Sequence, residues 1–205
     1  MESIARLSSA PLHAVATDEE LVSATQAGDR EAFDVLVQRW DRKIQGAIYR
    51  VMGSDEDARE LSQEAFFKAY RALDGFEQRA RFSSWLYQIA INLCRDRLRR
   101  RKGRRMLSLD DVSDSEVGPL VSVGPNVTET IEQNDLARVV ADAVAELPSQ
   151  QREVIVLKEY EELTFAQIAE VLGLPTSTVK TRLYRGLVEL RRNLERRGVR
   201  SGSPT

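Results

Sequence analysis

The chain has 205 residues, of which 42% are hydrophobic and 30% are charged. This balance is typical of a globular protein and excludes a largely disordered or membrane-embedded chain. The formal net charge of −2 excludes a polycation that coats DNA, so any contact with nucleic acid must use basic residues gathered locally.

Cysteine and histidine are too rare here to build a covalent or metal framework. Cys94 and His13 are the only residues of their types, which excludes disulfides and a Cys/His metal site. No phosphate-binding glycine loop and no nucleophile beside a base is recognisable, so we predict a protein that is not an enzyme and that uses no metal or cofactor. No signal peptide or membrane-length apolar run occurs, and we therefore expect a cytoplasmic protein without membrane insertion.

The first half of the chain predicts a helical domain after a tail over residues 1–17. Thr17 and Glu20 have the spacing of a capping box, and the apolar stripe of residues 30–52 predicts a long core helix. Ser54, followed by three acidic residues, is expected to open the next helix, and Ser83 to cap the one after it.

The helix expected after Ser54 has an ambiguous polar face. Its residues Glu60, Gln63, Glu64 and Lys68 share that face with Phe67, so one aromatic ring is expected to point partly outward. A docking site for a partner and an ordinary solvated face are equally compatible with this pattern.

A dense basic run ends the following helix and is opposed locally only by Asp96. The run consists of Arg95, Arg97, Arg99, Arg100, Arg101, Lys102, Arg104 and Arg105. Phe82, Trp85 and Tyr87 stand just before it, and aromatic rings beside cations suit a single-stranded nucleic acid, because bases stack on rings while cations follow phosphates. The alternative is that Phe82 and Trp85 belong to the core.

The composition then changes to acidic residues with Gly, Pro and Ser, which predicts a flexible linker over residues 103–134. Residues 135–197 predict a second helical domain, and residues 198–205 a short tail. The expected fold class is therefore all-α, with two small helical domains of which the second ends in a helix-turn-helix.

The helix-turn-helix is predicted from Thr164 to Asn193. Thr164 is a suitable N-cap, Gly173 suits the left-handed position after a helix, and Thr176 or Ser177 is expected to cap the second helix. Helices of this kind enter the major groove, where Lys and Arg reach guanine acceptors. The candidate DNA-contacting residues are Thr176, Ser177, Lys180, Thr181, Tyr184 and Arg185. A plain helical hairpin with a solvated basic face is the alternative.

Four blocks in this order carry a resemblance to a known family. They read GDREAFDVLVQRW, DARELSQEAFFKAYRALDGF, FSSWLYQIAINLCRDRLRR and LPSQQREVIVLKEYEELTFAQIAEVLGLPTSTVKTRLYRG. From about Asp18 to Leu194 the chain resembles the extracytoplasmic-function (ECF) group of bacterial RNA polymerase sigma factors. The resemblance implies that residues 18–102 form sigma domain two and residues 135–197 form sigma domain four.

The resemblance also implies partners and a function. The protein would bind core RNA polymerase, recognise the promoter minus-35 and minus-10 elements and promote promoter melting; an autonomous helix-turn-helix regulator is the alternative. The implied polymerase partners are the clamp helices of the largest subunit and the flap region of the second-largest subunit, and an anti-sigma factor is expected as an inhibitor. The residues implied to contact the clamp are Asp57, Glu60, Leu61, Gln63, Glu64 and Phe67.

For the minus-10 element the resemblance implies a pocket for a flipped base at Phe76, Ile89 and Asn92. Together with the aromatic and basic residues found above, the expected minus-10 site comprises Phe76, Phe82, Trp85, Ile89, Asn92, Arg95 and Arg99. The helix-turn-helix residues would read the minus-35 duplex.

Overall fold

The computed structural model describes residues 15–77, 80–107 and 131–199, with the side chains of residues 105–107 and 131–135 left aside. All regular structure in these ranges is helical, which confirms the predicted fold class. An N-terminal unit consists of α2 (Asp18–Gln26), α3 (Arg30–Met52), α4 (Asp55–Ala72), the 3₁₀ turn η1 (Leu73–Gly75) and α5 (Phe82–Leu107). A C-terminal unit consists of α6 (Ile131–Ala145), α7 (Ser149–Ile155), the π-helical turn η2 (Val156–Tyr160), α8 (Phe165–Leu172) and α9 (Thr176–Arg196).

Side-chain caps set several helix starts as the sequence predicts. Thr17 and Glu20 form a complete capping box, in which Glu20 Oε2 accepts from the Thr17 backbone N–H at 2.7 Å. Ser54 Oγ accepts from the backbone N–H of Asp57 at 3.2 Å at the start of α4. These contacts span three residues, so local sequence is sufficient to specify them.

Two predicted caps are wrong. Ser83 lies inside α5, because the helical hydrogen bonding already begins where Trp85 N–H donates to the Arg81 carbonyl at 3.2 Å. Neither Thr176 nor Ser177 caps α9: Pro175 holds the N-cap position, with φ −60° and ψ 142°, and no side chain makes a cap hydrogen bond there. The fixed φ of proline sets this helix start instead.

The segment between the two units is shorter than predicted. α5 continues to Leu107, and α6 begins at Ile131, so both helices extend into the expected linker over residues 103–134. Its remaining part, residues 108–130, lies outside the described residues. In the C-terminal unit, α7 ends at Ile155 and a π-helical turn follows, closed by Glu161 N–H donating to the Val156 carbonyl at 3.2 Å.

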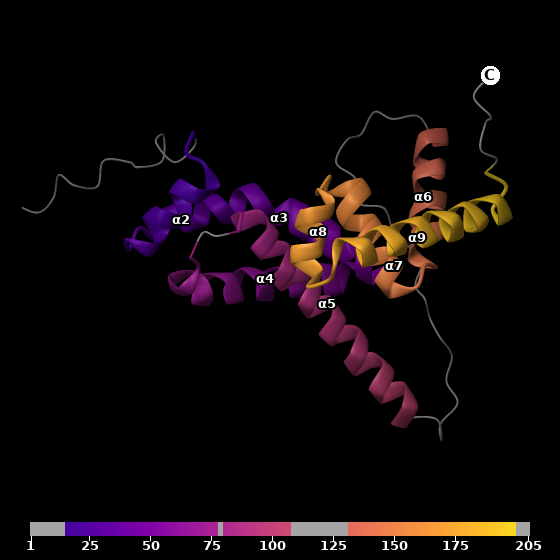
Figure 1. Ribbon diagram of the computed structural model, residues 1–205, viewed down its shortest axis with the longest axis horizontal. Helices are drawn as coiled ribbons and strands as arrows, with labels where there is room; N and C mark the ends of the chain where they lie inside the picture. Colours follow the sequence, from indigo (N-terminus) through magenta and orange to yellow (C-terminus); the bar gives the residue numbers. More distant parts are fainter. Residues whose placement is uncertain (1–14, 78–79, 108–130, 200–205) are drawn as a thin grey trace, which may run out of the picture.

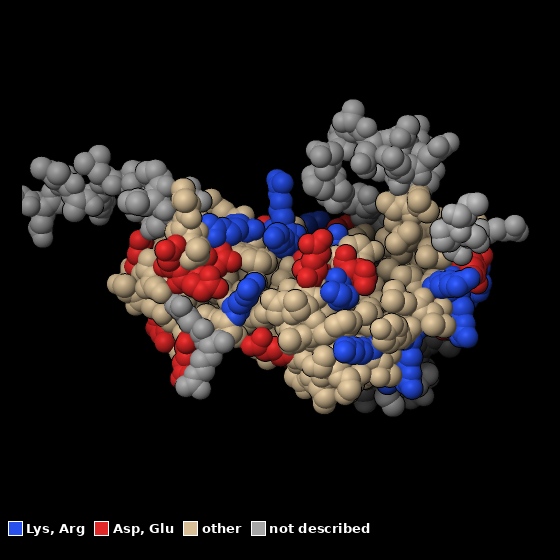
Figure 2. Space-filling view, turned by 45° about the horizontal axis from the view of Figure 1, so that its top comes forward, with Lys and Arg blue, Asp and Glu red and all other residues tan. Residues whose placement is uncertain are grey.

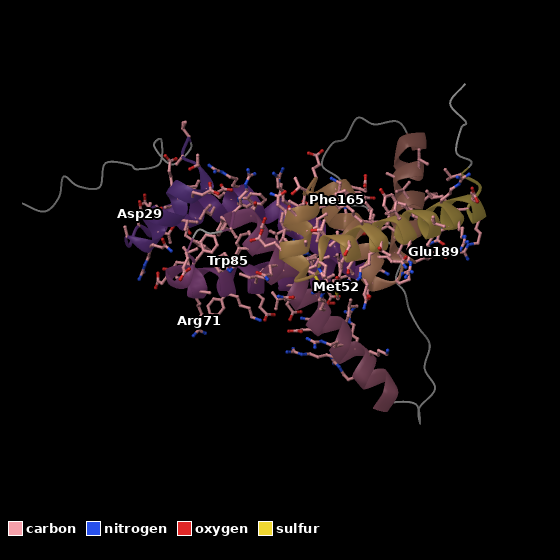
Figure 3. The ribbon with its side chains drawn as sticks, viewed as in Figure 1. Asp29, Met52, Arg71, Trp85, Phe165 and Glu189 are labelled. Carbon is pink, nitrogen blue, oxygen red and sulfur yellow. The ribbon has the colours of Figure 1, made fainter. Side chains whose placement is uncertain are left out.

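The two units pack against each other. Helix α8 lies along α5, and α3 contacts α6, α7 and η2, so that the buried side chains of both units form one continuous hydrophobic core. Met52, at the end of α3, lies at this junction (Figure 3). Figure 1 shows that the last turns of α5 run out from the packed body, away from both units. The sequence patterns predict two domains but give no indication that they close on each other.

Candidate nucleic-acid and polymerase interfaces

A groove of about 770 Å³ runs between α4 and α5 in the N-terminal unit. It brings together three of the predicted minus-10 residues, Trp85, Ile89 and Asn92. Figure 3 shows Trp85 on this unit with Arg71 on the neighbouring helix. Asn92 is exposed, so its amide is free to reach a ligand in the groove. An apolar wall with one accessible amide can hold a planar ring and read its polar edge.

Trp85 lines this groove, and two further aromatic rings support it from behind. Phe76 is stacked on Trp85, with 4.7 Å between ring centroids and 28° between ring planes. Phe82 packs beneath both rings and is fully buried, while Phe76 is 9% exposed. The predicted base contact of Phe82 is therefore not possible in this conformation, and the alternative reading, that Phe82 is core, describes the structure. Phe82 orients Trp85 instead.

Phe67 lines the same groove from α4, although the sequence resemblance assigned it to the polymerase-binding surface. Its ring is 61% exposed, in agreement with the predicted outward orientation, and the Arg71 guanidinium lies 5.7 Å from the ring centroid. Lys68 and Arg71 also line the groove and were missed as candidates. Lys68 follows Glu64, and Arg71 follows Phe67, by four residues; this spacing was the available signal, since residues four apart share a helix face.

Four of the eight basic residues in the run of α5 form ion pairs within the molecule. Arg97 lies 2.9 Å from the Asp57 carboxylate and 2.7 Å from that of Glu60. Arg101 lies 2.7 Å from the second Asp57 oxygen. Arg99 pairs with Asp96 and Arg95 with Glu153. Asp96 is the only one of these acids within the basic run itself; Asp57, Glu60 and Glu153 are distant in sequence, so the sequence pattern did not indicate their pairing.

The predicted polymerase-contacting residues divide into buried and accessible ones. Asp57 and Leu61 are each 1% exposed, so they support the surface of α4 and offer no direct contact in this conformation. The Glu60 side chain is 59% exposed, and its pairing with Arg97 lowers the pKa of its carboxyl. Gln63 is also exposed, and Glu64 pairs with Lys68 at 3.0 Å.

The helix-turn-helix forms as predicted. Thr164 and Gln167 make a capping box at the start of α8, and Gly173 ends that helix with a φ of 64°, in the left-handed region. The six candidate DNA-contacting residues are all exposed on the first turns of α9, with Tyr184 65% exposed. Lys180 Nζ lies 5.5 Å from the centroid of the Phe165 ring on α8. One accessible face of α9 thus carries cations, hydroxyls and an aromatic ring.

A second groove, of about 530 Å³, lies between the start of α7 and the first turns of α9. Thr181 and Arg185 line it, together with Arg182 and Ser149, which the sequence analysis did not single out. Guanidinium and hydroxyl donors in a groove beside a recognition helix suit a DNA phosphate. Arg182 could have been identified from the basic face of α9, but Ser149 is brought there only by the tertiary fold.

Charges on the surface are mixed. Figure 2 shows acidic and basic side chains interspersed over this face, with no single basic patch. Among the described residues, no group of three His, Cys, Asp or Glu side chains is placed to hold a metal ion. In the same part of the chain, no helix is both long and apolar enough to cross a membrane.

Comparison with known proteins assigns each unit to a family. Residues 36–104 match the family model described as Sigma-70 region 2, and residues 137–190 match the model described as Sigma-70, region 4. The first match covers α4, most of α3 and most of α5, and the second covers α7, α8 and most of α9.

Individual relatives extend the likeness over most of the chain. The ECF RNA polymerase sigma factor SigW of Bacillus subtilis is 35% identical over 177 residues, which are 84% of this chain and 94% of SigW. The ECF RNA polymerase sigma-E factor of Haemophilus influenzae is 33% identical over 172 residues, 82% of this chain and 90% of the relative. Among solved structures, CnrH in complex with the cytosolic domain of CnrY is similar, with a TM-score of 0.65, 26% identity and coverage of 87% of this chain and 97% of CnrH.

Proposed function

The chain belongs to the ECF RNA polymerase sigma factors, and on this premise we propose how its helical units divide the work of transcription initiation. A sigma factor binds core RNA polymerase, recognises promoter elements and promotes melting; the alternative, an autonomous regulator, is set aside. The observation that carries this function is the match of region 2 and region 4 models, in that order, to the two helical units.

The N-terminal unit binds the melted minus-10 strand in the groove between α4 and α5. Asn92 reads the edge of an unpaired base while Trp85, supported by Phe76, provides an apolar wall. Phe67, with the Arg71 cation over its ring, offers a second surface on which a base can stack. Phe67 therefore serves the DNA groove in this proposal, beside the α4 surface that the polymerase is proposed to take.

The C-terminal unit reads the minus-35 duplex with the exposed face of α9. Lys180 and Arg185 are suited to guanine acceptors in the major groove, and Tyr184 to apolar contact with a base. Arg182, in the groove beside α7, holds a phosphate and so fixes the register of the helix on the duplex. Lys180→Ala or Arg185→Ala is expected to weaken binding to the minus-35 duplex by about 1 to 3 kcal/mol.

The polymerase docks on the exposed polar residues of α4, which include Glu60, Gln63 and Glu64 of the predicted set. The clamp helices of the largest subunit take this surface, and the flap region of the second-largest subunit takes the C-terminal unit. Because polymerase and promoter DNA are found in the bacterial cytoplasm, the protein acts there. It positions both macromolecules without performing a reaction of its own, and it needs no metal or cofactor.

An anti-sigma factor is the remaining proposed partner. Its support is the solved complex of the similar protein CnrH with the cytosolic domain of CnrY, in which a second protein binds a chain of this fold. A pull-down from cells under non-inducing conditions should recover such an inhibitor bound to the parent protein. Recovery of no partner but polymerase would count against it.

Run-off transcription with purified core polymerase tests the function as a whole. On a genomic promoter library, we expect initiation only when the protein is added, and a protein that neither binds core nor directs initiation would refute the proposal. Asn92→Ala should impair open-complex formation with core affinity unchanged. Loss of core binding in that variant would show that Asn92 is structural.

A further inference from the structure

Buried acids of the C-terminal unit hold basic and hydroxyl groups of the N-terminal unit. The carboxylate of Glu153 on α7, with its side chain 2% exposed, accepts three hydrogen bonds from the Arg95 guanidinium on α5, at 3.1, 3.1 and 2.7 Å. Such a charge-assisted fork is directional as well as strong. Removing Arg95 while the units stay together would leave a buried carboxylate without its counter-charge.

A second cluster joins the units around Glu161, whose side chain is 6% exposed. The buried Tyr87 hydroxyl donates a hydrogen bond to Glu161 Oε2, and the Arg50 guanidinium lies 3.7 Å from Oε1. The same guanidinium lies over the Tyr160 ring, 4.5 Å from its centroid. Both clusters thus consist of an N-terminal donor and a C-terminal acid.

We propose that these two clusters form a latch, which keeps the free protein closed and unable to engage a promoter. The latch comprises Arg95 with Glu153, and Tyr87 and Arg50 with Glu161. It rests on the proposed function in one respect: Arg95, one of the residues expected at the minus-10 site, must contact the melted strand bound by the N-terminal unit. In the closed form Glu153 takes the position on Arg95 that a DNA phosphate would occupy, so acid and phosphate compete for one guanidinium.

Geometry gives a second reason why the closed form is inactive. Elements centred near minus-35 and minus-10 are separated by about 25 base pairs, or about 85 Å along the duplex at about 34 Å per turn. Helix α8 of the helix-turn-helix lies directly on α5, which carries Asn92 and Arg95. Two readers that touch cannot occupy both elements at once, so the units must separate before the protein can engage a whole promoter.

Separation of the two units costs free energy, which the binding of polymerase and DNA must offset. Separation exposes the apolar contacts of α5 with α8 and breaks both clusters, but it also returns Glu153 and Glu161 to water, which offsets part of that cost. The apparent DNA affinity equals the affinity of the open form multiplied by the fraction of molecules that are open. Polymerase contacts that hold the units apart therefore raise DNA affinity without adding a contact to DNA.

Small-angle X-ray scattering of the full chain tests whether the latch closes the molecule. Glu153→Arg and Arg95→Glu alone should each increase the radius of gyration, because each places like charges together. The double swap, Arg95→Glu with Glu153→Arg, should return it to the parent value. Single variants that are folded by circular dichroism and as compact as the parent would overturn the proposal. Tyr87→Phe, a milder change, should also expand the molecule.

DNA binding without polymerase tests whether the latch also acts as a gate. If about one molecule in ten is open, Glu153→Gln should bind a single-stranded minus-10 oligonucleotide up to about tenfold more tightly than the parent. Glu170→Gln, an exposed change on α8, should match the parent. An expanded Glu153→Gln protein with parental DNA affinity would refute gating. The scattering result needs no promoter activity, so its failure is distinguishable from failure of the proposed function.

Discussion

Gly186 on α9 lies so close to Ile155 on α7 that a β-carbon added to it would stand 2.9 Å from Ile155 Cδ1. The same atom would lie 3.2 Å from the β-carbon of Gln151. Only a residue without a side chain allows α9 to approach α7 this closely, and this approach fixes how the recognition helix is presented.

Gly186→Ala is therefore expected to lower the free energy of unfolding by about 1 to 3 kcal/mol and to weaken minus-35 binding, because α9 must shift. Gly103→Ala is the matched control, since a β-carbon there meets nothing within 4 Å and alanine favours the helix. Thermal unfolding and duplex titration measure both effects. If Gly186→Ala left both the stability and the duplex affinity unchanged, Ile155 would have to move aside without cost.

The latch and the packing at Gly186 were not predictable from the sequence, whereas the caps of α2, α4 and α8 were. A capping box joins residues three positions apart, so its pattern is readable along the chain. The Arg95–Glu153 pair spans 58 residues, and the bond from Arg152 to the Val51 carbonyl spans 101. No periodicity encodes such pairings, because they depend on how two finished units meet.

The exposure of the candidate site residues shows the same difference between local and tertiary information. The outward face of α9 follows from helical periodicity and is exposed as expected. In the N-terminal unit, the sequence indicated the aromatic residues but not how deeply each one is buried, because a group of aromatic residues near a helix start does not show which rings face the core. Phe82 is buried and Trp85 is only partly buried, a difference set by packing against Phe76.

Asp57 is expected to stabilise the N-terminal unit. Its buried carboxylate bridges Arg97 and Arg101, at 2.9 and 2.7 Å, so Asp57→Asn should leave two cations under-compensated. We expect a loss of about 2 kcal/mol in the free energy of unfolding. Glu56→Gln, exposed at the start of the same helix, should lower the free energy of unfolding by only about 0.3 kcal/mol. Equal chemical-denaturation midpoints for the two variants would contradict a structural role.

Cys94 is expected to be chemically inert in the native protein. Burial raises the pKa of its thiol to about 12, with a further contribution from the nearby Glu153 carboxylate, so almost no thiolate exists at pH 8. A thiol reagent at pH 8 should label Cys94 only after denaturant is added. An Ala166→Cys variant, exposed on α8, should react at once with a single thiol. Rapid labelling of the native parent would show that the core around Cys94 opens.

Asp96 is expected to influence which base the minus-10 groove accepts. Its carboxylate lines the groove one turn after Asn92, where it repels phosphate but accepts hydrogen bonds from an exocyclic amino group. We expect a base with an amino group, such as cytosine, to bind more tightly than thymine by about 1 to 3 kcal/mol. Asp96→Asn should reduce that difference, and Asp34→Asn, exposed on α3, should not. Binding of the holoenzyme to forked DNA with single base changes measures this difference in affinity. Identical base preferences in all three proteins would show that Asp96 does not select the base.

Glu161 is expected to make stability depend on pH in an acidic window. Burial raises the pKa of its carboxyl above the ordinary value of 4.5, although the Tyr87 hydroxyl and the nearby Arg50 and Lys43 cations act in the opposite direction. A raised native pKa means that this group contributes stability below pH 4.5 that is lost as pH rises through the native pKa. Glu161→Gln accepts the Tyr87 hydrogen bond without titrating, so the parent's free energy of unfolding relative to the variant should fall as pH increases from 4 upward. Chemical denaturation of both proteins at several pH values measures this difference in the free energy of unfolding. A difference that rises with pH would mean that the native structure favours the charged carboxylate.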